Sequence, residues 1–152
     1  MRTVYLDMDG PLADFDKAIG EERNENGDPP EMFKKGFFRN LEVTPYAKMG
    51  VSLLLSCKDI DLYIASKPST KNLYSATEKY EWIDEHFPEL LKKVFLTCNK
   101  GKLIGDYLID DDASRWKKKF KGEFIQFYPA APITSWYNIV DTLGICNERV
   151  LH

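Results

Sequence analysis

The feature that most constrains this sequence is the stretch Val4-Tyr5-Leu6-Asp7-Met8-Asp9-Gly10, in which two carboxylates follow a short apolar run. The β-branched and bulky residues at 4–6 predict a buried parallel strand. Open α/β folds bind ligands at the carboxyl ends of their strands, where Asp7 and Asp9 would lie. Residues two apart in an extended chain point to the same side, so these like charges require a cation or a shared proton. Oxygen ligands favour Mg²⁺ as that cation.

The size and charge of the chain exclude several classes of protein. Its 152 residues, 43% of them hydrophobic, fit a single domain spanning 1–152 with a core of its own. The net charge of −3 and the pI near 5.5 argue against a broad surface for polymeric nucleic acid, although a small positive pocket remains compatible with them.

Targeting and cysteine signals are equally limited. No apolar run approaches the ~20 residues of a membrane helix, and no signal peptide precedes the first strand, so we expect no membrane and a cytoplasmic location. Cys57, Cys98 and Cys146 are odd in number and far apart, which argues against a zinc site or a disulfide framework. The sequence leaves open whether two copies form a homodimer.

Segments with strand and helix character alternate along the rest of the chain. We expect strands at about 3–7, 61–65, 94–97, 107–110 and 124–127, and helices at about 12–23, 44–57, 70–87, 113–120 and 134–143. This alternation predicts a three-layer α/β fold with a doubly wound parallel sheet of strand order 3-2-1-4-5. That order places the first strand beside the fourth and opens a crevice between them.

Two local patterns refine this outline. The segment 12–43 is too short for a domain and is expected to form a small helical cap inserted after the first strand. Thr44-Pro45 is typical of a helix start, with a hydroxyl N-cap before proline. In the 70–87 helix the expected buried stripe is Leu73, Ala76, Tyr80 and Ile83.

Functional groups follow three of the predicted strands: Asp7 and Asp9, then Ser66, then Asp110 and Asp111, with Lys100 just before the fourth strand. This set is suited to phosphoryl transfer. One aspartate can attack phosphorus to give an acyl phosphate, and a second can protonate the leaving oxygen and then deprotonate water. A lysine and a hydroxyl can hold the phosphate oxygens while Mg²⁺ offsets their charge.

Each of these residues also has a plainer interpretation. An aspartate after a strand commonly caps the next helix, which is what we expect of Asp112. Alone, Ser66 is typical of a turn and Lys100 of an exposed surface. Same-sided acids beside a buried strand are costly without a function, so the joint occurrence of the set favours a site.

The motifs Asp7-Met8-Asp9-Gly10, Ser66, Lys100 and Leu108-Ile109-Asp110-Asp111 resemble, in this order, the haloacid dehalogenase (HAD) superfamily of phosphatases. The resemblance is narrower when further segments are included. Residues 7–15, Phe37-Phe38, Glu78-Lys79-Tyr80-Glu81-Trp82, 96–100 and Ser135-Trp136 are similar to the 5'(3')-deoxyribonucleotidases, over nearly the whole chain.

The resemblance implies a role for each matching residue. Asp7 would be the nucleophile and Asp9 the general acid and base. Mg²⁺ would be bound by Asp7, Asp9 (through its backbone carbonyl) and Asp111, supported by Asp110. Phosphate would be held by Ser66, Lys67 and Lys100, and the nucleoside by Phe15, Phe37 and Phe38. The implied substrate is a deoxyribonucleoside monophosphate, since an apolar wall near the 2' position would leave a ribose hydroxyl without a partner.

The chain departs from the family pattern near the phosphate. Cys98 stands where the family has arginine, and Lys67 follows Ser66 where the family has serine after threonine, so Lys67 can supply the missing charge. Phe33 is expected in the core and Tyr80 in helix packing, while Lys79 either reaches the site or is solvated. Two other functions stay open: a HAD-type phosphatase of another small phosphate ester, and a non-enzymatic phosphoacceptor or nucleotide-sensing module.

Overall fold

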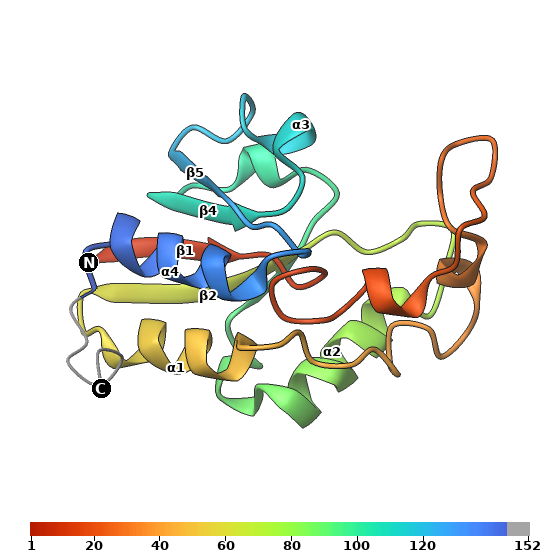
Figure 1. Ribbon diagram of the computed structural model, residues 1–152, viewed down its shortest axis with the longest axis horizontal. Coiled ribbons are helices and arrows are strands. Elements are labelled where there is room, and N and C mark those ends of the chain that lie inside the picture. Colours follow the sequence, from red (N-terminus) through yellow and green to blue (C-terminus); the bar gives the residue numbers. More distant parts are fainter. Residues whose placement is uncertain (146–152) are drawn as a thin grey trace.

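A computed structural model describes residues 1–145 and contains the α/β sheet that the sequence predicts (Figure 1). Five strands form one sheet in the order β3-β2-β1-β4-β5, and each neighbouring pair is parallel. The strands are β1 (Arg2–Leu6), β2 (Ile60–Ser66), β3 (Val94–Leu96), β4 (Tyr107–Asp110) and β5 (Glu123–Gln126). The predicted fold class and strand order are confirmed, and the strand bounds agree within one residue.

Helices cover both faces of this sheet. They are α1 (Ala47–Ser56), α2 (Ser75–His86), α3 (Ala113–Trp116) and α4 (Pro132–Thr142). Alternate side chains of β1 point to opposite faces. Val4 and Leu6 belong to the larger core, which includes residues of α1, α2 and α4, whereas Tyr5 packs with Trp116 and Phe120 in a smaller one. The sheet is therefore the middle of three layers.

The segment between β1 and α1 differs from the helical cap that was predicted. Within the described residues, positions 12–43 contain no α-helix, only turns and two short 3-10 helices, Asp16–Ala18 and Pro30–Phe33. The expected helix at 12–23 is absent because its backbone bonds elsewhere. Leu12 and Ala13 both donate to the Met8 carbonyl, at 3.0 and 2.9 Å, and the Leu12 carbonyl accepts from Thr44, at 2.8 Å.

The helix starts also differ from expectation. Thr44 does not cap α1: its hydroxyl donates to the Gly10 carbonyl at 2.6 Å, and α1 begins at Ala47. The helix α2 begins at Ser75, five residues later than predicted. Of its expected stripe, Leu73 is 91% and Tyr80 40% exposed. Ile83 is buried as predicted, and the other residues that α2 buries are Ser75, Glu78, Lys79 and Trp82.

Later bounds need smaller corrections. The helix α3 ends at Trp116 instead of about 120, and α4 (Pro132–Thr142) begins two residues before its predicted start. Gly144, at φ +65°, lies just after the end of α4. Cys146 lies outside the described residues. Across residues 1–145, none of the helices has the length and apolar character needed to cross a membrane.

Candidate active site

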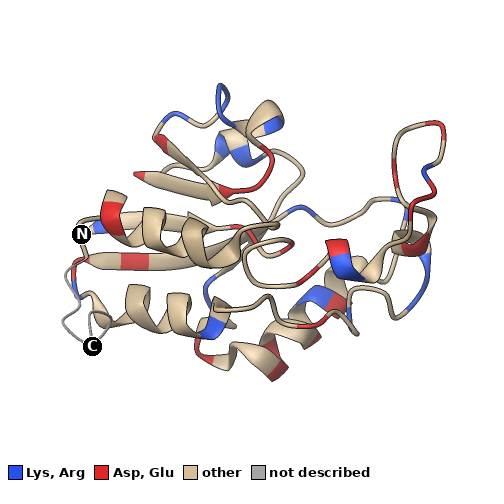
Figure 2. Cartoon of the chain, viewed as in Figure 1, with Lys and Arg blue, Asp and Glu red and all other residues tan. Residues whose placement is uncertain are grey.

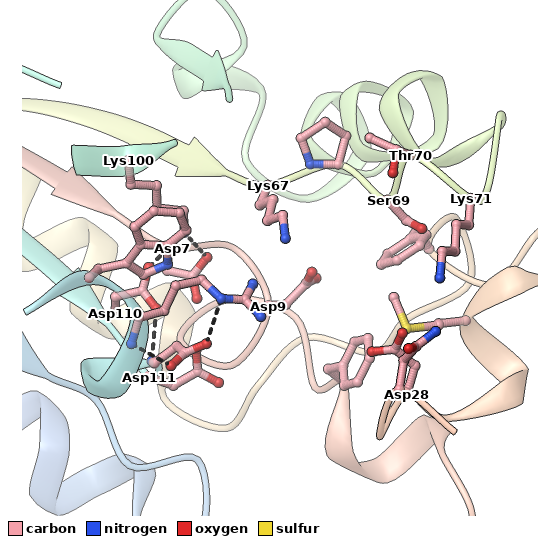
Figure 3. Close-up of a pocket in the computed structure, with 18 of the residues that line it drawn as sticks. Asp7, Asp9, Asp28, Lys67, Ser69, Thr70, Lys71, Lys100, Asp110 and Asp111 are labelled. Atoms are coloured by element: carbon pink, nitrogen blue, oxygen red, sulfur yellow. Dashed lines mark hydrogen bonds and ion pairs between the residues drawn. The ribbon is translucent and has the colours of Figure 1, made fainter. Parts of the chain in front are cut away.

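A cavity of about 490 Å³ lies at the carboxyl ends of β1 and β4 (Figure 3). One side of it carries the acidic residues that follow these strands, together with Lys100. The opposite side is formed by Asp28 and by the segment Ser69-Thr70-Lys71 after β2 (Figure 3). Residues far apart in sequence therefore meet in one crevice, where the sheet order predicts it.

Lys100 is the buried centre of the acidic side. Its Nζ lies 2.7 Å from Asp7 Oδ1 and 2.6 Å from Asp110 Oδ2, and all three side chains are almost fully buried. The backbone N–H of Met8 also donates to Asp7 Oδ1, at 2.9 Å. Both donors contact the same oxygen of Asp7, so neither occupies Oδ2.

Asp111 completes a group of three carboxylates. Asp7, Asp110 and Asp111 each offer an oxygen within 4.8 Å of the others. Gly10 makes this approach possible, since it has φ +110° and a Cβ there would lie 3.0 Å from Asp111 Oδ2. The Asp9 carboxylate lies outside this group, so a metal contact through the Asp9 backbone carbonyl stays a prediction.

The electrostatics of the three acids favour a bound cation. Burial and the charge of Asp110 raise the pKa of Asp7 well above its ordinary value, against the attraction of Lys100. Burial, partly offset by hydrogen bonding to Asp7, raises the pKa of Asp111 to about 7. Burial disfavours the charged form of Lys100, but Asp7 and Asp110 outweigh it and raise the pKa of Lys100. Lys100 pairs with two of the three carboxylates and Asp111 forms no ion pair with it, so the oxygens of this group suit a hard divalent cation such as Mg²⁺.

Asp9 pairs with a lysine to which the sequence alone did not assign a position. Lys79 Nζ lies 2.8 Å from Asp9 Oδ2 and 2.8 Å from Ser66 Oγ, and the Lys79 side chain is 0% exposed. It also lies 4.5 Å from the ring centroid of Phe38. The two open interpretations of Lys79 are thus resolved: it reaches the site and is not solvated. Its only sequence signal was the Glu-Lys-Tyr-x-Trp segment.

The predicted phosphate ligands lie at different depths. Lys67 is exposed and lines the cavity, and the buried Lys100 lines it as well. Ser66 is 1% exposed and is not among the described residues that line the cavity. Cys98, in the place of the family's arginine, is exposed and likewise outside the described lining. Asp112 caps α3 as expected, accepting from the Arg115 N–H at 3.1 Å.

The predicted aromatic residues form one cluster. Phe37 packs edge-on against Phe15 and Phe38, with ring centroids at 5.4 and 5.0 Å. Phe15 and Phe38 line the cavity, whereas Phe37 lies behind them. Phe33, which we expected in the core, is half-buried and lines the cavity. This correction follows from the 3-10 helix at Pro30–Phe33, which ends at the cavity instead of in the core.

Polar residues complete the wall opposite the acids. Asn26, Asp28 and Lys71 line the cavity there. None of the three was predicted: Asn26 and Asp28 lie in a loop with no motif, and Lys71 lies before the start of α2, in the stretch that was expected to be helical.

Residues 30–137 match the model of a family described as "5' nucleotidase, deoxy (Pyrimidine), cytosolic type C protein". The chain belongs to this family. Among its relatives, a human 5'(3')-deoxyribonucleotidase, cytosolic type, is 30% identical over 139 residues, covering 71% of this chain and 69% of the human one. A Staphylococcus epidermidis protein, provisionally named 5'(3')-deoxyribonucleotidase, is 32% identical over 149 residues, covering 82% and 81%. A mouse mitochondrial 5'(3')-deoxyribonucleotidase is 36% identical over 78 residues, covering 51% and 36%.

This nucleotidase family belongs to the HAD superfamily, so the resemblance inferred from the motifs is confirmed. The activity named for its relatives is that of a phosphoric monoester hydrolase of the 5'-nucleotidase type.

Proposed function

We propose that this chain is a Mg²⁺-dependent phosphatase that hydrolyses deoxyribonucleoside monophosphates through a phosphoaspartate on Asp7. The observation that carries the proposal is the Asp7–Lys100–Asp110 cluster, with Asp111 beside it, at the base of the cavity. The names of its relatives support the substrate class. The proposal keeps the predicted single HAD-like domain, with residues 12–43 as a small cap, and a cytoplasmic location.

Asp7 is suited to the role of nucleophile because one of its oxygens is fixed. Lys100 and the Met8 N–H hold Oδ1, which orients the carboxylate and leaves Oδ2 to attack phosphorus. A bond then forms between Oδ2 and phosphorus while the bond from phosphorus to the nucleoside oxygen breaks. The product of this step is an acyl phosphate on Asp7.

Asp9 would move the protons of both steps. It gives a proton to the departing nucleoside oxygen, and then takes one from the water that attacks the phosphoaspartate. Attack by this water breaks the bond between Asp7 and phosphorus, so inorganic phosphate leaves and both aspartates return to their starting state. The Asp9 side chain lies at the cavity (Figure 3), as this role requires.

The cavity also offers positive charge to the phosphate. Lys67 is free to turn toward the oxygens of a bound phosphate, and Lys100 has a third N–H beyond those directed at Asp7 and Asp110. Mg²⁺ would be held by Asp7 and Asp111, with Asp110 in support and the Asp9 carbonyl as a further ligand. When bound, it would supply positive charge that offsets the phosphate oxygens. The surplus of carboxylates fits such an ion.

The aromatic wall would receive the nucleoside. Phe15, Phe33 and Phe38 line the cavity and offer apolar contacts to the sugar and the base. A ribose 2'-hydroxyl buried against such a wall would lose its hydrogen bonds to water without gaining a partner. We therefore expect deoxyribose to be preferred.

The test is a phosphate-release panel over ribo- and deoxyribonucleoside 5'- and 3'-monophosphates, with MgCl₂ or with EDTA. The expected result is release from deoxyribonucleotides that depends on Mg²⁺ and is faster than from the matching ribonucleotides. A pure, folded sample that releases no phosphate from any member of the panel would remove the proposal.

A second candidate keeps the chemistry and changes the substrate to another small phosphate ester. It is favoured by the polar wall of Asn26, Asp28 and Lys71, which could bind groups other than a base. Rates on dUMP, UMP and an aryl phosphate separate the two candidates. A phosphoaspartate that survives for minutes would instead favour the phosphoacceptor module.

A further inference from the structure

Lys79 is the most deeply buried cation at the site, yet it cannot touch a substrate. Its side chain is 0% exposed, and it is not among the described residues that line the cavity. A buried ammonium is costly unless it is paired. Lys79 is fully engaged, by Asp9 at 2.8 Å, by Ser66 at 2.8 Å and by the ring of Phe38 at 4.5 Å.

We propose that Lys79 is a positioning residue, which fixes the Asp9 carboxylate in the orientation from which Asp9 exchanges its proton. This inference rests on the proposed function, because it assigns to Asp9 the proton transfers of the phosphatase reaction.

The two oxygens of Asp9 have different surroundings. Oδ2 accepts a hydrogen bond from Lys79 Nζ, whereas Oδ1 is buried and has no hydrogen-bond partner among the described residues. An ammonium group can only donate, so Oδ2 acts as the acceptor that holds the carboxylate against Lys79. The Asp9 side chain is 24% exposed and lines the cavity, so the carboxylate that Lys79 orients is the one that meets the leaving oxygen and the attacking water.

Lys79 can fix Asp9 only if Lys79 itself cannot move, and the helix α2 provides this. The neighbouring Glu78 accepts from the Gly36 N–H through both carboxylate oxygens, at 2.5 and 3.1 Å. Trp82, one turn further along α2, donates from its indole N–H to the Leu41 carbonyl at 2.8 Å. The side of α2 that carries Lys79 is thus attached to the chain around residues 36–41.

Ser66 and Phe38 hold the other sides of the ammonium. The Ser66 hydroxyl accepts the second N–H, and the face of Phe38 lies close enough for a cation–π interaction. The position of Asp9 is therefore set by residues from β2, α2 and the cap segment together. A lysine that only neutralised the charge of Asp9 would not need three such partners.

A change of leaving group separates positioning of the acid from a purely structural role. The alkoxide that leaves dUMP needs a proton, whereas the phenolate that leaves 2,4-dinitrophenyl phosphate does not. The variants are Lys79→Gln and Lys79→Met, with Lys79→Arg as a rescue and the exposed Lys118→Gln as the matched control. The measurement is kcat/KM on both esters with Mg²⁺. Because both rates come from the same sample, their ratio does not depend on how much of a variant has folded.

The expected loss for Lys79→Gln or Lys79→Met on dUMP is about 100-fold, within the range for a positioned acid. The loss on the aryl ester should be at least about tenfold smaller, because its leaving group needs no proton from Asp9. The ratio of kcat/KM on dUMP to kcat/KM on the aryl ester should therefore fall by about 10-fold or more. Lys79→Arg should restore part of the ratio, and Lys118→Gln should leave it unchanged. In an Asp9→Asn background, Lys79→Gln should not shift the ratio further.

Two results would overturn the inference. Equal losses on both esters would show that Lys79 acts on folding or phosphate binding alone, and no loss on either would show that Asp9 needs no anchor. In both cases the parent protein still hydrolyses dUMP and the proposed function stands. A parent protein that hydrolyses neither ester overturns the proposed function and this inference with it.

Discussion

Two buried lysines pair with the two aspartates that follow β1, and their surroundings differ. Lys100 lies between the carboxylates of Asp7 and Asp110, with Asp111 close by, so that acids outnumber cations. Lys79 faces one carboxylate, one hydroxyl and one aromatic ring, which leaves its charge balanced. We therefore expect a further cation on the side of Asp7, the proposed nucleophile, and none on the side of Asp9, the proposed acid. Figure 2 shows that basic and acidic residues are spread over the strands, helices and loops of the chain.

The sharpest test of the nucleophile side is Asp7→Asn. An amide cannot form the acyl phosphate, so we expect turnover to fall by on the order of 10⁴-fold or more, as for other residues of a catalytic unit. Phosphate release measures the loss, and calorimetric titration with dUMP should show that substrate still binds. An active Asp7→Asn protein would contradict the role of Asp7.

On the acid side, Asp9→Asn should cost less. The amide oxygen can still accept from Lys79, so the fold is retained, but the proton transfers are lost. We expect kcat to fall by roughly 10²–10⁴-fold on dUMP. If Asp9→Asn is as active as the parent protein, the role assigned to Asp9 is wrong.

Stability separates the two lysines more directly. Lys100→Met leaves the buried Asp7 and Asp110 without their shared cation, which should lower the free energy of unfolding in EDTA by about 3–5 kcal/mol. Mg²⁺ should restore much of this loss by binding the same acids. The Lys79→Met substitution should also lower the free energy of unfolding. Mg²⁺ should raise the free energy of unfolding of this variant by no more than it raises that of the parent protein.

Urea denaturation of the parent and both variants, with EDTA and with MgCl₂, provides the comparison. An equal effect of Mg²⁺ on Lys100→Met and Lys79→Met would show that the two clusters do not differ in their need for a cation.

The smallest expected effect is a pH dependence of the metal-free protein. Burial raises the pKa of Asp111 to about 7 in the folded state, whereas an unfolded Asp titrates near 4. Between these values the unfolded state binds fewer protons than the folded state, so stability falls as the pH rises from about 4 to about 7. Thermal unfolding in EDTA across this range measures the slope. Asp111→Asn should flatten it, and a Tm that rises with pH in the parent protein but not in that variant would contradict the sign.

The strands and the acidic half of the site could be predicted from the sequence because their signals are local. A short apolar run ending in Asp-x-Asp-Gly determines both the strand and the place of its carboxylates. The parallel sheet then brings Asp110 and Asp111 to the same edge.

The cap and the inner face of α2 could not be predicted, because long-range contacts decide them. The apolar spacing at 12–19 resembles a helix, but the backbone there bonds to residues 8 and 42–44 instead. Hydrophobic periodicity assigns Glu78 and Lys79 to the surface of α2. Both are buried because Gly36, Asp9 and Ser66 provide their partners, and these lie 13 to 70 residues away in sequence.

Residues 30–41 are attached by hydrogen bonds to α2 and to Asn72 before it, and this attachment has a consequence for how a nucleotide enters the cavity. Asn72 donates to the carbonyls of Met32 and Lys34, and Glu78 and Trp82 hold Gly36 and Leu41. Moving residues 30–41 outward would break all of these bonds together and would displace α2, which carries Lys79, the partner of Asp9. The wall that bears Phe38 therefore stays in place when a nucleotide enters. Any movement of this wall would also change the position of Asp9, so substrate entry and the alignment of Asp9 are coupled.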